Sequence, residues 1–131
     1  MTPDLPFVDE HRACLPHPRE RVWSALDRYA ARSLRLPPRL ALVLGTDPAE
    51  GFARTTVRAP ERLDLEGRHR FSTYLLRFDL DENGDGTVLR ASTYAVFPGL
   101  RGRVYRALVI GSGGHAVAVR RMLRAVERGI G

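Results

Sequence analysis

Four histidines are the side chains of this sequence best suited to acid–base chemistry, because an imidazole titrates near neutral pH. They are His11, His17, His69 and His115. None shows metal-ligand spacing, and there is no His-Glu-x-x-His motif. The single cysteine, Cys14, excludes an internal disulfide and any site built from several cysteines. The sequence therefore predicts no metal and no cofactor, and single histidines are the candidates for chemistry.

Asp9 and His11 form the first candidate pair. In the strand predicted over Phe7–Leu15 they are two residues apart, so they share one face. A carboxylate in this position can orient an imidazole, which could then act as a general acid or base. The alternative is that His11 is a hydrogen-bonded histidine of the core without a chemical role.

His115 is the second candidate, and its surroundings depend on the glycine-rich stretch IGSGGH (residues 110–115). This stretch is neither a P-loop nor a Gly-x-Ser-x-Gly elbow, because no Gly-Lys-Ser/Thr follows and position 110 is isoleucine. It predicts a kink or a break in a helix. In a continuous helix His115 points at the sheet, where the glycines leave space for a ligand. After a true break it begins a new helix beside solvent.

The acidic stretch DLDENGDG (residues 79–86) has the spacing of the first half of a calcium-binding EF-hand loop. The bidentate glutamate needed at the twelfth position is replaced by Arg90, or by Ser92 in the alternative register. Both flanks read as strands rather than helices. The stretch therefore predicts the turn of a β-hairpin and no metal site.

Hydrophobic periodicity defines the elements that must position these residues. The clearest are two alternating runs, 72–80 and 89–97, whose apolar faces meet on one side when the turn between them folds. A helix is predicted to begin at Pro18, with Val22 and Leu26 on its apolar face. Further strands are predicted over Arg39–Gly45, Phe52–Ala59 and Arg62–Gly67.

Residues 97–131 predict a long amphipathic helix, or two helices in phase. Spacings of three and four put an apolar stripe on one side and arginines on the other. The stripe consists of Val104, Leu108, Gly111, His115, Val119, Met122 and Val126. We therefore predict an α+β helix-grip fold: one domain, residues 1–131, with a curved antiparallel sheet of about seven strands wrapped on a long C-terminal helix.

This order of elements resembles the START/Bet v 1-like (SRPBCC) superfamily, which includes polyketide cyclase/dehydrase-like proteins. LPHPRERVWSAL (residues 15–26) is similar to its strand end, proline and VW-x-x-L opening. PERLDLEGRHRFSTYLLRFDLDENGDGTVLRASTYAVFPG (residues 60–99) is similar to its central strands, and the last helix matches in position. The resemblance covers nearly the whole chain without a diagnostic catalytic signature. It implies a cavity between sheet and last helix that binds lipids, sterols, quinones, polyketides or other hydrophobic molecules, on which a minority of members catalyse reactions.

Composition limits the other classes of function. Hydrophobic residues are 44% and charged residues 27%, as in ordinary globular domains. No apolar run approaches the ~18 residues of a membrane span, and the start of the sequence lacks the pattern of a signal peptide. We therefore expect a cytoplasmic location and no stable membrane insertion. The net charge of +6 comes from scattered arginines without interleaved stacking aromatics, so no nucleic-acid partner is expected.

We predict that the chain binds a small hydrophobic molecule, a lipid, quinone or polyketide-like compound, without catalysing a reaction. No arrangement of nucleophile, base and oxyanion donors can be read from the sequence, so no catalytic residue is predicted. The predicted ligand-binding residues are His11, Tyr74, Leu76, Phe78, Ala91, Thr93, Val104, Leu108 and His115. Two alternatives stay open: a cyclase or dehydratase acting on a polyketide-like substrate, and an interaction protein that docks an acidic partner through its arginines.

Overall fold

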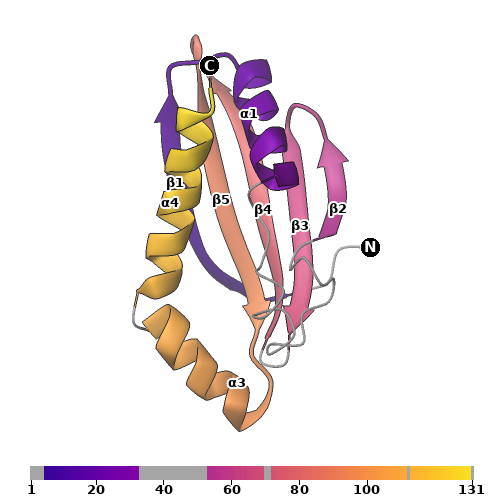
Figure 1. Ribbon diagram of the computed structural model, residues 1–131, viewed down its shortest axis with the longest axis vertical. Helices are drawn as coiled ribbons and strands as arrows, with labels where there is room; N and C mark the ends of the chain where they lie inside the picture. Colours follow the sequence, from indigo (N-terminus) through magenta and orange to yellow (C-terminus); the bar gives the residue numbers. More distant parts are fainter. Residues whose placement is uncertain (1–4, 33–52, 70–71, 112, 131) are drawn as a thin grey trace.

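A computed structural model of the chain describes residues 5–32, 53–69, 72–111 and 113–130. Its framework is an antiparallel sheet with the strand order β1-β5-β4-β3-β2. The strands are β1 (Phe7–Leu15), β2 (Ala53–Arg58), β3 (Arg62–His69), β4 (Ser72–Asn83) and β5 (Gly86–Val96). The helices are α1 (Arg19–Arg32), α3 (Gly99–Arg106) and α4 (Gly114–Arg128), with a π-helical turn (Ala107–Gly111) between the last two. Both α1 and α4 lie on one face of the sheet (Figure 1).

The predicted α+β class, with an antiparallel sheet and a C-terminal helix, is confirmed. The predicted number of about seven strands is wrong for the described residues, which form five. The strand expected over Arg39–Gly45 lies outside the described residues. The helix expected from Pro18 is α1, which begins one residue later and buries Val22 and Leu26 as predicted.

The hairpin between β4 and β5 has the turn that the sequence predicts. Asn83 pairs with Gly86, so the loop consists of Gly84 and Asp85. Gly84 has a φ of +62°, and a glycine with positive φ at the first loop position is the pattern of a type II′ hairpin. A side chain at Gly86 would lie 2.7 Å from the carbonyl oxygen of Leu15, so this position also needs glycine. The tight turn leaves Asp79, Asp81 and Glu82 in β4 and only Asp85 in the loop.

The core lies between the inner face of the sheet and the two helices that cover it. Leu63, Phe78 and Ala91 are neighbours in one row across three strands and are fully buried. Leu26 of α1 and Val126 of α4 pack into the same cluster. Each fully buried valine, leucine or phenylalanine of this cluster contributes about 1.5–3 kcal/mol to folding. This packing holds α1 and α4 on the sheet.

The outer face of the sheet is charged and internally paired. Asp64 of β3 is buried and accepts two hydrogen bonds from Arg77 of β4, at 2.9 and 3.0 Å. Arg62 donates to Asp79 across the same two strands at 2.7 Å. Breaking a buried pair by removing one partner typically costs about 3–5 kcal/mol, because the other charge is left uncompensated. These arginines thus stabilise the sheet by pairing with carboxylates on neighbouring strands.

The C-terminal segment departs from the predicted stripe in its first half. Val119 and Val126 of α4 are buried as expected, whereas Val104 and Leu108 are 54% and 69% exposed. The π-helical turn and the left-handed Gly113, with φ +81°, shift the helical phase between the two halves. As Figure 1 shows, α3 consequently extends away from the sheet, while α4 lies along it.

Candidate functional site

Four polar side chains from three elements meet on the inner face of the sheet. His11 Nε2 lies 3.1 Å from Asp9 Oδ2, both on β1. His115 Nε2, in the first turn of α4, lies 3.0 Å from Thr93 Oγ1 of β5 and 3.3 Å from Asp9 Oδ1. The carboxylate of Asp9 is therefore flanked by two imidazoles. We call Asp9, His11, Thr93 and His115 the histidine cluster.

Strand register and one helix boundary assemble this cluster. Asp9 pairs with Thr93 and His11 with Ala91, so alternation turns the first three members of the cluster to the same face. His115 is the second residue of α4, which begins after the left-handed Gly113. The sequence offered two outcomes for His115, a continuous helix facing the sheet or a break facing solvent. The structure combines the break with the inward orientation.

The cluster is accessible to a small molecule without being a surface feature. The side chains of His11, His115 and Asp9 are 15%, 20% and 28% exposed. Asp9 Oδ1 is itself buried and has no well-aligned hydrogen bond within the described residues. If each Nε2 carries the proton, His11 donates it to Asp9 and His115 donates it to Thr93, and each Nδ1 is left as an acceptor. The cluster could accept a hydrogen bond or a proton from a bound molecule.

The cluster does not have the make-up of a metal site. In the described ranges, no group of three or more His, Cys, Asp and Glu side chains is placed to hold a metal ion. Cys14 is exposed and unpaired, so it adds no ligand. The arrangement instead provides hydrogen-bond and proton-transfer groups.

Aromatic side chains border the cluster on the side of α3. Tyr74 pairs with Ala95 on the inner face, one row along from Thr93. Burial, together with a smaller contribution from the neighbouring Tyr105 of α3, raises the pKa of Tyr74 to about 12. Burial also raises the pKa of Tyr105, whose ring centroid lies 6.2 Å from that of Phe97. Both hydroxyls therefore stay protonated, and the half-buried rings give the cluster an apolar border.

The structure divides the nine predicted ligand-binding residues into three groups. His11, Thr93 and His115 come together in the cluster, and Tyr74 borders it. Leu76, Phe78 and Ala91 are buried in the core of the same sheet face. Val104 and Leu108 instead face solvent, on α3 and in the adjoining π-helical turn. Asp9 and Tyr105 were missing from the predicted set, although the two-residue spacing of Asp9 and His11 indicated the first of them.

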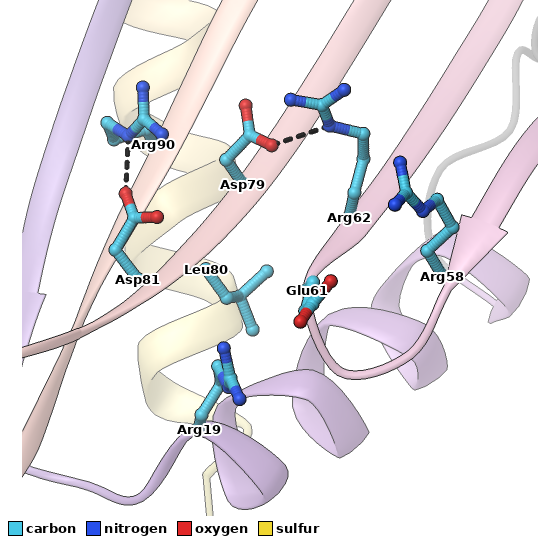
Figure 2. A pocket seen from close by; sticks show the side chains of 8 residues that line it. All are labelled: Arg19, Arg58, Glu61, Arg62, Asp79, Leu80, Asp81 and Arg90. Carbon is cyan, nitrogen blue, oxygen red and sulfur yellow. Dashed lines mark hydrogen bonds and ion pairs between the residues drawn. The ribbon is translucent and has the colours of Figure 1, made fainter.

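A hollow of about 320 Å³ lies away from the histidine cluster, at the rim of the sheet (Figure 2). Arg62 is paired with Asp79, and Arg90 donates to Asp81 at 2.7 Å. Among the described residues that line it, Leu80 alone is apolar, so the hollow does not suit a hydrophobic ligand. Sequence reasoning missed it because its residues come from separate elements. They are Arg19, Arg58, Glu61, Arg62, Asp79, Leu80, Asp81 and Arg90.

Comparison with known proteins identifies the fold. No protein-family model matches the sequence, and no curated protein matches it. Solved structures do match. Protein Mll3558 from Rhizobium loti is 16% identical with a TM-score of 0.58, over 92% of this chain and 94% of that one. CalU16 from Micromonospora echinospora is 20% identical with a TM-score of 0.53, over 92% of this chain and 82% of CalU16.

DynU16, a protein of the dynemicin biosynthetic locus, is also similar. It is 16% identical with a TM-score of 0.58, and the match covers 96% of this chain and 47% of DynU16. The chain thus spans about half the length of DynU16. At this level of identity the likeness shows a shared fold. It leaves the role of each residue to the site itself.

Proposed function

We propose that this chain binds a small, mainly apolar molecule on the inner face of the sheet, and that the histidine cluster holds a hydroxyl or carbonyl group of that molecule. The observation that carries the proposal is the position of the cluster, which is partly exposed beside half-buried aromatic rings. The ligand's polar group would bond to an imidazole, and its apolar part would lie against Tyr74 and Tyr105. A few polar groups in an apolar surround is the usual composition of a small-molecule site.

The class of ligand follows from two lines of support. The fold is shared with DynU16, a protein of a biosynthetic locus, which favours a small organic molecule over a macromolecule. The sequence resemblance to polyketide cyclase/dehydrase-like proteins favours the same class. A lipid, a quinone or a polyketide-like compound with a single polar end fits both.

Native mass spectrometry of the protein purified from its own host tests this proposal, followed by a panel of lipids, quinones and aromatic polyketides in a thermal-shift assay. Thr93→Val removes the hydrogen bond that orients His115 and should weaken ligand binding by about 0.5–1.5 kcal/mol, the contribution of one hydrogen bond. Ser92→Ala is the matched control, because Ser92 is the next residue of β5 on the outer face and bonds to Glu10. A protein with no co-purifying ligand and no stabilisation by the panel would rule the proposal out.

One carboxylate between two imidazoles favours a second candidate function, a cyclase or dehydratase. Dehydration needs a base that removes a proton from carbon and an acid that protonates the departing hydroxyl. His11 and His115 could divide these roles, with Asp9 stabilising whichever imidazole is charged. The Nε2 atoms of the two histidines lie 3.1 and 3.3 Å from the two carboxylate oxygens of Asp9.

Asp9→Asn separates the two candidates. A binding protein with this substitution should keep most of its affinity, because the imidazoles still face the ligand. An enzyme should keep its affinity and lose turnover, because the amide does not stabilise an imidazolium. Ligand affinity and product formation are measured on the same variant, and unchanged turnover would exclude a role for Asp9 in catalysis.

A further inference from the structure

Helix α3 presents its apolar residues to solvent. Leu100 is 77% exposed, and Val104 follows one turn later on the same side. Leu108, in the adjoining π-helical turn, is exposed as well. In Figure 1 α3 extends from the end of β5 and lies apart from the sheet.

The opposite side of α3 fixes this orientation. A side chain at Gly102 would lie 2.5 Å from the backbone of Phe97, so only glycine allows the helix to approach that closely. Tyr105 packs against the Phe97 ring, and the Arg106 guanidinium lies 5.5 Å from the centre of the same ring. The helix is thus held by a glycine, a tyrosine and an arginine, and its leucine and valine are left free to meet something else.

Arginines flank the exposed apolar side, and no acidic residue lies near it in sequence. Arg101 and Arg103 are exposed on either side of the line from Leu100 to Val104. The sequence contains no Asp or Glu from Gly86 to Val126. The surface is therefore apolar along its centre and positive at its edges. A second copy of the same surface would place arginine against arginine, which disfavours a symmetric dimer.

We propose that α3 docks this protein on an anionic lipid surface, with Leu100, Val104 and Leu108 entering the boundary between headgroups and acyl chains. Arg101 and Arg103 would contact lipid phosphates. Helices that lie in this boundary combine an apolar side with arginines or lysines beside it. A bilayer needs no groove to receive a protruding helix, which makes it a better match than a folded acidic protein. With three apolar side chains the contact is peripheral and reversible. This membrane proposal depends only on the surface of α3 and does not require the proposed ligand.

Co-sedimentation with vesicles tests the proposal, comparing phosphatidylcholine alone with an equimolar mixture of phosphatidylcholine and phosphatidylglycerol. We expect binding to the mixed vesicles at low salt and little to phosphatidylcholine. Val104→Asn should weaken that binding several-fold. The matched control is Val57→Asn, the same change at a valine of β2 that is 51% exposed, and it should have no effect.

The electrostatic part has its own matched pair. Arg101→Gln with Arg103→Gln should weaken binding by more than tenfold, since each arginine near an anionic surface strengthens binding about fivefold. Arg120→Gln with Arg124→Gln removes the same charge from exposed positions of α4 and should have a much smaller effect. Equal losses in the two pairs, or no binding of the natural protein to mixed vesicles, would overturn the proposal. So would a dimer in light scattering that Val104→Asn dissociates, because a second copy would then occupy the surface.

Discussion

Helices α3 and α4 come from one amphipathic pattern, yet they bury opposite sides. In α4 the apolar residues Val119, Leu123 and Val126 face the sheet. In α3 the apolar Leu100 and Val104 face solvent, and Gly102 faces the protein. The difference shows that an amphipathic stripe fixes the spacing of a helix's faces without fixing which face the fold will cover. In α3 the buried face is set by the close approach of Gly102 to Phe97, and in α4 it is set by the burial of apolar side chains.

Truncating the apolar residues of the two helices should give the largest contrast. Leu123→Ala removes buried methyl groups from the core and should lower the free energy of unfolding by about 2–5 kcal/mol. Leu100→Ala removes exposed ones and should change it by less than about 0.5 kcal/mol. Denaturant unfolding of both variants measures the contrast. Similar losses would mean that α3 buries its leucine in solution.

Two glycines of the same segment test the steric argument. Gly102→Ala forces a methyl group against the Phe97 backbone and should cost about 1–3 kcal/mol, the typical penalty for overpacking. Gly111→Ala meets open space at a position without positive φ, so it should be neutral or stabilise by up to about 1 kcal/mol. Thermal unfolding of the two variants compares them directly. A neutral Gly102→Ala would show that α3 is not held by this contact.

The third contrast concerns the first turn of α4, where His115 faces the sheet. His115→Phe removes the hydrogen bond to Thr93 and the contact with Asp9, and should cost about 0.5–1.5 kcal/mol or more, because buried polar partners stay unpaired. His17→Phe is the control, since His17 lies in the turn before α1, outside the cluster. Denaturant unfolding and the NMR signals of the remaining imidazoles are measured for both variants. Equal losses of stability in the two variants would show that His115 does not belong to the histidine cluster.

The sequence predicted those parts of the structure that depend on local pattern. Alternation defined β4 and β5, and the two-residue spacing of Asp9 and His11 placed both side chains on one face. The approach of His115 to Thr93 could not be read in the same way, because it depends on where α4 crosses β5. The exposure of Val104 was missed for a related reason: the contact that turns α3 is made by Gly102, a residue without a side chain to mark its face.

The last expected effect is a pH dependence that reports whether the inner side of α3 stays docked. The pKa of Tyr74 is raised to about 12 in the folded protein by burial, with Tyr105 of α3 adding to it, while an unfolded tyrosine titrates near about 10. Between these values the unfolded chain releases a proton that the folded chain keeps. Stability should therefore be independent of Tyr74 below pH ~10 and fall as pH rises toward about 12.

Two variants separate the contribution of Tyr74 from that of α3. Tyr74→Phe should remove its share of the loss, because the phenylalanine has no proton to release. Gly102→Ala, which pushes α3 off Phe97, should move Tyr105 away and return the Tyr74 titration toward the ordinary range of a tyrosine. Tyrosinate absorbance gives the titration, and unfolding at several alkaline pH values gives the stability. If Gly102→Ala leaves the titration of Tyr74 unchanged, the burial of Tyr74 does not depend on α3, and α3 is free to move without disturbing the border of the site.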